Sequence, residues 1–372
     1  MSATNEPSHV VYLCTSNSWG GLEMNQLRNA IWMSERRVEV TVIGENNTPL
    51  KKACEEAKIP YISIPTHRKY YDFKSGKHLA RILRNLSATH LIVRDTRDLS
   101  LAVIAKRHSN VHLSYFMEMQ LGVKKKHLLH TLRFSYIDLW SCPLHWLKNQ
   151  VLTMTNMEPQ RVCVIPSGLD LQALHTNLDQ NASREALNLP MDVPIFGLIG
   201  RFDPHKGQLL LLEALTRMNN QTAHLCFLGE PTRNEGDTYY HEMLRTIEQH
   251  QLHSRVHIRP FRRDINTFYR AIDAFVLGSR AETFGMVTIE AMAMGTPILA
   301  SRSGGSPEIL QNGKLGRLYT PGDPTDLSKH MDDFLNSNSP SAETLRAAAK
   351  RYDHHTVVEQ VVLALDVKRG AF

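Results

Sequence analysis

The stretch formed by residues 273–308 constrains the fold more than any other part of the chain. The apolar run at residues 274–277, ended by a glycine, predicts a buried strand. A helix is expected over residues 287–294, because Gly295 follows it and a proline comes soon after. Residues 298–301 predict the next strand, which leads through a glycine turn into another helix. This alternation is typical of doubly wound α/β domains, whose ligands bind at the strand-to-helix loops.

Two glutamates in this stretch, Glu282 and Glu290, have seven residues between them. The expected elements place Glu282 on the loop and Glu290 on the early helix, which would let both carboxylates face the same side. Since a carboxylate accepts hydrogen bonds from two neighbouring hydroxyls, this pattern predicts a site for sugar hydroxyls and a phosphate. The alternative is that both are solvated surface acids. The residues at the helix N-terminus, where free N–H groups attract anions, are Phe284, Gly285, Met286 and Val287.

Another strand-loop-helix pattern begins at residue 195. A strand at residues 195–200 is followed by a loop that contains Arg201 and Lys206, and then by a helix at residues 208–218. Two fixed cations at a strand end suit a diphosphate, because arginine binds phosphate oxygens in pairs and lysine adds a point charge. The loop lacks the Walker A pattern, and both side chains could equally be surface cations.

The chain opens with the same kind of pattern. A strand at residues 10–14 is followed by a loop with Gly20 and Gly21, and then by a helix at residues 22–36. Adjacent glycines let a backbone approach a ligand closely in front of a helix N-terminus, or they form only a turn. The dinucleotide fingerprint GxGxxG is absent from this loop.

A run of three lysines stands before a set of apolar residues near residue 130. Two interpretations are open: a solvated charged patch with the apolar residues in the core, which we expect, or a surface that faces anionic lipid or phosphate-bearing glycan. The residues are Lys124, Lys125 and Lys126, followed by Leu128, Leu129, Leu132 and Phe134 at helical spacing.

Length and composition bound the remaining choices. The 372 residues suffice for about two domains, and we place the boundary near residues 167–190, with residues 171–194 as a polar, helix-rich linker region. With 43 basic and 37 acidic residues, the charge suits an anionic substrate or a membrane surface and is too small to indicate nucleic acid. Five widely spaced cysteines, and no signal-peptide pattern or membrane-length apolar run, predict reduced thiols in a cytoplasmic protein.

Three strings together carry a resemblance to a known family. They are E-T-F-G-M-V-T-I-E at residues 282–290, A-M-A-M-G-T-P at residues 291–297 and S-R-S-G-G-S-P-E at residues 301–308. They resemble the retaining nucleotide-sugar glycosyltransferases of the group-1 (family-4) class, which have the type-B fold. The G-R-x(4)-K-G string at residues 200–207 is similar to the diphosphate-binding loop of the same class.

The resemblance implies an α/β fold of two Rossmann-like domains facing a cleft. Residues 1–170 would bind the acceptor, residues 171–356 would bind the nucleotide sugar, and a final helix at residues 357–372 would pack back on the first domain. The implied reaction moves a sugar from a nucleotide-diphosphate donor, with UDP or GDP expected, to a glycan or glycolipid hydroxyl in lipopolysaccharide or polysaccharide synthesis. No metal or cofactor is implied, and the expected location is cytoplasmic, peripheral to the inner face of the membrane. The alternatives are an inactive sugar-nucleotide-binding scaffold, or an epimerase or phosphorylase on the same fold.

The resemblance also implies residue roles. Arg201 and Lys206 would stabilise the leaving diphosphate, and Glu282 would hold the donor sugar. Glu290 would bind the ribose diol, and Arg259 is placed near the base. Gly20 and Gly21, in a W-G-G-x-E-like loop, would approach donor phosphates and acceptor. Where many relatives carry a sugar-contacting histidine, this chain has Glu118 or Gln120.

Overall fold

The computed structural model describes residues 8–231, 237–280 and 282–367, which form two compact units. One unit comprises the described residues up to Gly168 together with those from His354 onward. The other comprises Leu169–Asp353. The chain therefore leaves the first unit once and returns to it for its last helix.

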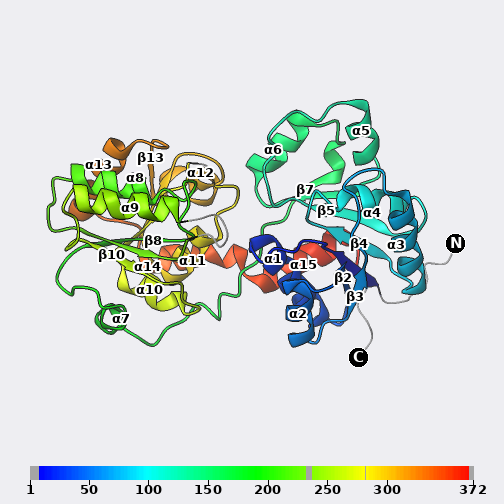
Figure 1. The fold of residues 1–372 in the computed structure, drawn as a ribbon, viewed down its shortest axis with the longest axis horizontal. Coiled ribbons are helices and arrows are strands. Elements are labelled where there is room, and N and C mark those ends of the chain that lie inside the picture. The colour runs from blue at the N-terminus through cyan, green and yellow to red at the C-terminus, as the bar shows by residue number, and fades with distance from the viewer. Residues whose placement is uncertain (1–7, 232–236, 281, 368–372) are drawn as a thin grey trace. The chain divides into compact units, whose positions relative to one another are not determined.

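The first unit is built on a seven-stranded parallel sheet with the strand order β3-β2-β1-β4-β5-β6-β7 (Figure 1). This order reverses between β1 and β4, as in doubly wound folds. The strands are β1 (His9–Leu13), β2 (Glu39–Glu45), β3 (Tyr61–Ile64), β4 (His90–Val93), β5 (His112–Phe116), β6 (Leu139–Cys142) and β7 (Val162–Val164).

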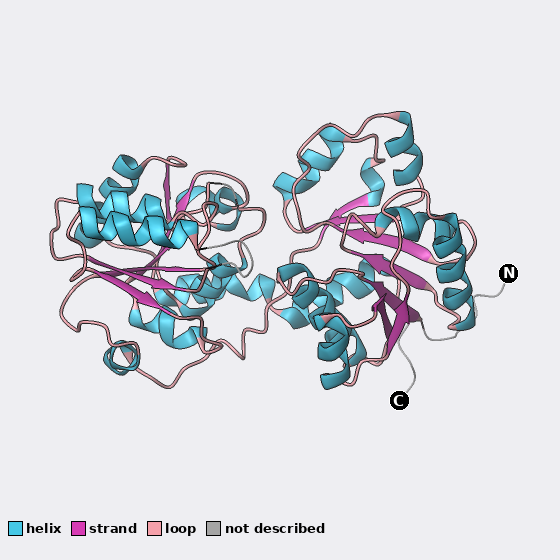
Figure 2. Ribbon diagram, viewed as in Figure 1, coloured by secondary structure: helices cyan, strands magenta, loops and turns pink. Residues whose placement is uncertain are grey.

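Helices cover both faces of this sheet, so successive residues of a strand enter different cores (Figure 2). In β1, Val11 and Leu13 pack with α3, α4 and α6, whereas Val10 and Tyr12 pack with α1, α2 and α15. The helices are α1 (Gly21–Ser34), α2 (Pro49–Glu56), α3 (Phe73–Asn85), α4 (Leu99–Lys106), α5 (Leu128–Phe134), α6 (His145–Met154) and α15 (His354–Leu365).

The second unit repeats the design with a six-stranded parallel sheet of order β10-β9-β8-β11-β12-β13. Its strands are β8 (Ile195–Ile199), β9 (His224–Leu228), β10 (Val256–Arg259), β11 (Ala274–Leu277), β12 (Ile298–Ser301) and β13 (Arg317–Tyr319). Its helices are α7 (Gln180–Ala186), α8 (Gln208–Arg217), α9 (Thr238–Gln249), α10 (Ile265–Ala271), α11 (Met286–Met294), α12 (Ser306–Ile309), α13 (Pro324–Asn336) and α14 (Ala342–Ala349). Short 3-10 turns lie at Pro159–Arg161, Gln311–Gly313 and Lys350–Tyr352.

The prediction of a linker at residues 171–194 was wrong. α7 is the one α-helix in this stretch, and the segment is fixed to the second unit by the buried side chain of Arg184. The Arg184 guanidinium lies 2.7 Å from Asp273 Oδ2 and donates a 3.0 Å hydrogen bond to the carbonyl of Ala271. A buried, paired arginine ties the segment to the start of β11, so it is part of the domain rather than a spacer.

The prediction that the leucines near residue 130 belong to the core was also wrong for three of them. Phe134 is buried, but Leu128, Leu129 and Leu132 on α5 are exposed. The helix has seven residues and contacts the core through Phe134 near its end. Its apolar stripe therefore faces outward.

Candidate active site

The second unit brings three loops together at the carboxyl ends of its central strands. β8 pairs with both β9 and β11, so the strand order reverses between β8 and β11. The loop after β8, with Arg201 and Lys206, therefore leaves the sheet beside the loop after β11, with Glu282. Such a reversal point is where open α/β sheets bind ligands.

Two glycines allow these loops to touch backbone to backbone. Gly207 has φ +81°, and a Cβ atom there would stand 2.2 Å from the carbonyl oxygen of Gly278. A side chain at Gly278 would in turn approach the carbonyl of Lys206 to 2.8 Å. Only glycine fits at this contact, which holds Lys206 at the beginning of the β11 loop.

Lys206 and Glu282 form the polar centre of these loops. Lys206 Nζ lies 3.3 Å from Glu282 Oε2, and both side chains are half-buried. The hydroxyl of Ser279, which is buried, donates to the same carboxylate oxygen at 3.3 Å. A lysine and a carboxylate side by side can bind an anionic group and a hydroxyl on one ligand.

The loop after β12 fixes the backbone of Glu282. The N–H of Gly305 donates to the Glu282 carbonyl at 2.9 Å, and a Cβ on Gly304 would stand 2.2 Å from that oxygen. Gly304 has φ +58°, which favours glycine. Gly304 and Gly305, the two adjacent glycines of the string at residues 301–308, thus fix the backbone position of Glu282. The spacing of the string alone did not reveal this role.

The N-terminus of α11 follows directly. Gly285 caps the helix with φ +80°, and the N–H groups of Met286 and Val287 lie in the first turn, before any intrahelical acceptor. The ring of Phe284 is buried and packs edge-on against Tyr352 at 5.8 Å. A ligand contact by Phe284 would therefore be made by its backbone.

Glu290 lies one turn further along α11, on the same half-exposed face as Met286 and Val287. The hydroxyl of Tyr269 donates to Glu290 Oε2 at 2.9 Å and lies 3.1 Å from the carbonyl of Val287. Burial raises the pKa of Tyr269 well above its usual value, and the Glu290 carboxylate acts in the same direction, so the phenol remains a donor. Tyr269 sits on α10 and was missed by the sequence reasoning, because nothing in the local pattern of residues 265–271 distinguishes it from a core residue.

The two arginines that the sequence analysis assigned to the site differ in their exposure and in their partners. Arg201 is exposed, and its guanidinium lies 3.8 Å from Asp203 Oδ2. Arg259 is engaged with backbone carbonyls, at 2.9 Å from Ile258 and 2.6 Å from Asn188. The structure thus gives Arg259 a role in joining β10 to the end of α7, and its base contact remains a prediction without support from this geometry.

Gly20 and Gly21 lie between β1 and α1 in the first unit. Gly20 has an extended backbone, and its N–H donates to Glu23 Oε2 at 2.9 Å. A Cβ on Gly21 would meet nothing within 4 Å, and one on Gly20 would meet only Glu23 Oε2 at 3.5 Å. Neither glycine is required by packing within this unit, which leaves space above the helix N-terminus.

Glu118, which with Gln120 is one of two residues that the resemblance places where many relatives carry a histidine, is part of a buried polar group after β5. It forms an ion pair with Arg94, and Asn25 Nδ2 lies 3.4 Å from its second oxygen. Burial raises the pKa of Glu118, although the charge of Arg94 opposes the shift. The Arg94 guanidinium also lies 5.1 Å from the ring centroid of Phe116.

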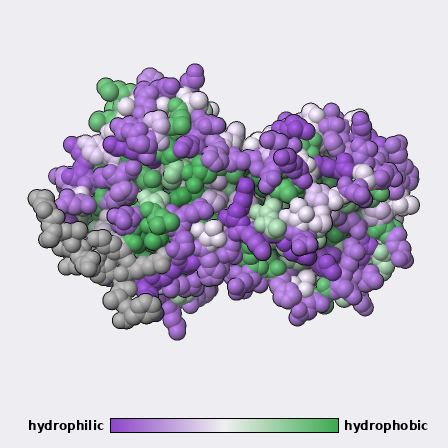
Figure 3. All heavy atoms as spheres, turned by 180° about the vertical axis from the view of Figure 1, so that it is seen from behind, coloured by the Kyte–Doolittle hydropathy of each residue, from purple (hydrophilic) through white to green (hydrophobic). Residues whose placement is uncertain are grey.

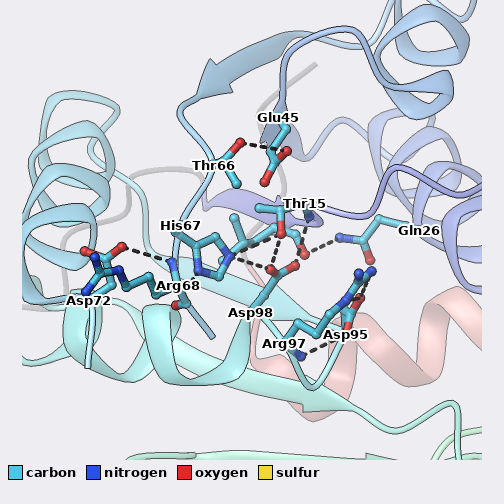
Figure 4. Close-up of polar contacts among 11 residues, drawn as sticks. Thr15, Gln26, Glu45, Thr66, His67, Arg68, Asp72, Asp95, Arg97 and Asp98 are labelled. Atoms are coloured by element: carbon cyan, nitrogen blue, oxygen red, sulfur yellow. Dashed lines mark hydrogen bonds and ion pairs between the residues drawn. The ribbon is translucent and has the colours of Figure 1, made fainter. Parts of the chain in front are cut away.

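A second buried polar group joins the loops after β1, β3 and β4 (Figure 4). His67 Nε2 lies 3.0 Å from Asp98 Oδ1, and His67 Nδ1 lies 2.9 Å from the carbonyl oxygen of Arg68. The same carboxylate accepts hydrogen bonds from the hydroxyl and the backbone N–H of Thr15. Both ring nitrogens of His67 thus face acceptors, an arrangement that favours the imidazolium form beside the carboxylate. The bond to Asp98 raises the pKa of His67 against the effect of burial.

This arrangement assigns His67 to positioning. An imidazolium with both N–H groups engaged has no lone pair with which to accept a proton from a substrate. Asp98 instead connects the loop that leads to Gly20 with the loop at residues 65–72. The sequence reasoning missed this group, because its members, Thr15, His67 and Asp98, come from three separate loops.

Within the ranges that the structure describes, no helix combines the length and apolar character that crossing a bilayer requires.

The second unit matches a family model. Residues 179–352 match the family of glycosyl transferases group 1. D-inositol 3-phosphate glycosyltransferases of Mycobacterium tuberculosis and Mycobacterium bovis are 28% identical to the chain over 206 residues, which are 55% of this chain and 42% of theirs. The chain thus aligns with less than half the length of these curated relatives.

Solved structures are similar over nearly the whole chain. A glycosyltransferase from Rickettsia africae ESF-5 matches with a TM-score of 0.86 and 18% identity, over 97% of this chain and 98% of that one. Anabaena Alr3699/HepE in complex with UDP matches with a TM-score of 0.83 and 21% identity, over 96% and 99%. At these identities the likeness shows the fold, which is the two-domain α/β fold of type-B glycosyltransferases. The domain at residues 179–352 thus matches the group 1 family of glycosyl transferases, in agreement with this fold.

Proposed function

We propose that this chain is a retaining hexosyltransferase that moves a sugar from a nucleotide-diphosphate sugar to a hydroxyl of a glycan or glycolipid. The observation that carries the proposal is the Lys206–Glu282 pair, 3.3 Å apart, at the sheet's reversal point and beside the N-terminus of α11. A cation and free N–H groups suit the diphosphate, and the carboxylate suits the sugar hydroxyls.

In the proposed reaction, the bond between the anomeric carbon and the β-phosphate oxygen breaks, and a bond to the acceptor oxygen forms on the same face of the sugar. The acceptor proton passes to the departing phosphate, so no side chain needs to act as nucleophile. Negative charge grows on the β-phosphate, where Lys206, Arg201 and the first turn of α11 would stabilise it. Lys206 is half-buried and can turn from Glu282 toward the phosphate.

We further propose that the donor carries UDP, with Glu290 binding the ribose diol. The Tyr269 hydroxyl, 2.9 Å from Glu290 Oε2, would orient the carboxylate for two neighbouring hydroxyls. The similarity to the UDP and UDP-glucose complexes of Anabaena Alr3699/HepE supports this choice over GDP. With cations already supplied by the chain, the proposed reaction needs no metal.

The acceptor in this proposal is a lipopolysaccharide or polysaccharide precursor, and the enzyme works at the cytoplasmic face of a membrane. The open space beside Gly21 would admit part of the acceptor.

The test is donor turnover without acceptor, measured as release of nucleoside diphosphate from UDP-glucose, UDP-galactose and GDP-mannose. We expect slow release from one UDP-sugar, no requirement for orthophosphate, and retention of the anomeric configuration by proton NMR once an acceptor is found. A requirement for orthophosphate would indicate a phosphorylase instead. Nucleotide binding without any release would indicate an inactive sugar-nucleotide-binding scaffold.

A further inference from the structure

Exposed apolar side chains are concentrated in one region of the first unit. Leu128, Leu129 and Leu132 on α5 are 81%, 64% and 53% exposed, and Tyr71 and Phe73 before and at the start of α3 are 68% and 56% exposed. Isolated exposed leucines are ordinary, but a contiguous set marks an interaction surface. Figure 3 shows hydrophobic surface around α5, at the upper left of the view, next to hydrophilic surface.

The two segments form the walls of one groove. A cavity of about 600 Å³ is lined by side chains from both, among them Tyr70, Phe73, Leu128, Leu132 and Tyr136. The groove is open to solvent, and most of its lining is aromatic or aliphatic. It is therefore a preformed place for an alkyl chain.

Several cations lie around this groove, and the carboxylate of Asp72, between Tyr71 and Phe73, accepts hydrogen bonds from the backbone N–H groups of Arg68 and Ser75. Among the described residues, Lys69, Lys125 and Arg133 form no ion pair with a carboxylate, and no acidic residue occurs between residues 119 and 137. The Arg133 guanidinium and Lys69 Nζ both lie over the ring of Tyr70, at 5.8 Å and 5.4 Å from its centroid. Burial lowers the pKa of Lys125, and the charges of Arg133 and Lys69 act in the same direction. Cations gathered in this way favour an anionic ligand.

We propose that this region, here called the α5 surface, binds a bilayer of anionic phospholipid. The α5 leucines enter the interface, the groove takes an acyl chain, and the cations contact lipid phosphates. The members of the α5 surface are Lys69, Tyr70, Tyr71, Phe73, Lys124, Lys125, Lys126, Leu128, Leu129, Leu132 and Arg133. Its purpose rests on the proposed function, since it would bring the site to a lipid-linked acceptor, but the binding itself is independent of turnover.

The combination of features favours a bilayer over a protein partner. Long flexible cations beside aliphatic tips suit a surface with a charged layer above an apolar layer. Each lysine near an anionic bilayer contributes about a fivefold gain in partitioning, so three adjacent lysines contribute on the order of a hundredfold. That attraction falls as salt is added, because the charges are exposed.

The experiment is flotation of the full chain with vesicles of phosphatidylcholine alone or with one-quarter phosphatidylglycerol, at low and high salt. We expect binding to the anionic vesicles at low salt, and at least tenfold weaker binding to neutral vesicles or at high salt. The variant L128A/L129A/L132A should bind at least tenfold more weakly. Its matched control, L178A/L244A/L363A, removes three exposed leucines elsewhere and should bind like the wild type.

A second pair of variants tests the charges. K124Q/K125Q/K126Q should lose most anionic binding, whereas K58Q/K314Q/K329Q, which changes three exposed lysines elsewhere on the chain, should lose little. Donor hydrolysis in solution should be unchanged in L128A/L129A/L132A, which separates this proposal from the proposed function. Equal binding to neutral vesicles, or wild-type binding by both α5 variants, would overturn the proposal. Normal vesicle binding by L128A/L129A/L132A with lost turnover on a lipid acceptor would instead make the groove an acceptor subsite.

Discussion

Lys206 is the residue on which the proposed chemistry depends most. Its place beside Glu282 is enforced by the contact of Gly207 with Gly278, not by burial of its own side chain. A half-buried lysine can therefore be removed without opening a cavity in the core. Loss of Lys206 should weaken the stabilisation of the transition state and leave the stability of the fold unchanged.

We expect Lys206→Ala to lower turnover about a hundredfold or more, since one lost group that stabilises developing charge costs about 3 kcal/mol. The melting temperature should stay within a few degrees of the wild type. The measurement is donor turnover together with calorimetric melting. Lys329→Ala, which removes an exposed lysine of α13, is the control and should change neither. Wild-type turnover in Lys206→Ala would remove this residue from the reaction.

Tyr269 offers a test of the role given to Glu290. Tyr269→Phe deletes the hydroxyl that lies 2.9 Å from Glu290 Oε2. We expect the dissociation constant for UDP to rise severalfold, because one hydrogen bond contributes about 1 kcal/mol. Titration calorimetry measures it.

The control for Tyr269→Phe is Thr296→Val. It deletes a buried hydroxyl that donates its proton to the carbonyl of Tyr269 at 2.9 Å and not to Glu290. Both variants should lose about 1 kcal/mol of unfolding free energy. If they weaken UDP binding equally, Tyr269 acts only through the fold.

At the scale of elements, the loops of the first unit are held by the ion pair between His67 and Asp98. The pKa of His67 is raised in the folded state. The pair therefore contributes its full stabilisation of the fold at pH values below about 6.5, the pKa in the unfolded chain, and this contribution is lost as the pH rises through the pKa in the folded protein. We expect the melting temperature of the wild type to exceed that of His67→Gln at pH 6, and the difference between the two melting temperatures to shrink by pH 9. Calorimetry across this range measures it.

His253→Gln serves as the control for that series. His253 lies 2.6 Å from Glu248, but both side chains are exposed, and such pairs contribute about 0–1 kcal/mol. A difference between wild type and His67→Gln that stays constant with pH would show that the His67 ring is not charged.

The loop between β1 and α1 provides an element-scale test with two readouts. Gly21→Ala adds a Cβ in open space at the first residue of α1, and alanine is favoured over glycine in helices by up to about 1 kcal/mol. We therefore expect unchanged or higher thermal stability. Turnover should fall, because the methyl group enters the space proposed for the acceptor. Full activity with raised stability would show that this glycine serves only the turn.

Element positions followed from the sequence more readily than contacts did. The strands at residues 274–277 and 298–301 and the helix that ends before Gly295 were predicted to within one residue, because apolar runs and stop signals are local. The exposure of the α5 leucines was not predicted, because helical spacing of leucines does not say whether a core lies opposite them. Tyr269 and His67 act on residues far away in the sequence, which no local pattern encodes.

At the scale of the whole molecule, the chain repeats one design twice. Each unit has a parallel sheet whose order reverses beside its first strand, and in each the loop after that strand contains glycines. The last helix, α15, returns to the first unit, where Val357, Val358 and Val361 are buried in its core. The resemblance implied such a return for a helix at residues 357–372, and α15 begins at His354.

Titration of the full chain with UDP, GDP and ADP, followed by thermal melting, tests the central claim most directly. We predict that UDP binds and, at a hundred times its dissociation constant, stabilises the folded protein by about 2.7 kcal/mol. In Glu290→Ala, measured alongside, UDP should no longer raise the melting temperature, although the variant remains folded. If folded wild-type protein shows no shift with any nucleotide, the site does not bind a nucleotide-diphosphate donor, and the proposed glycosyl transfer is contradicted.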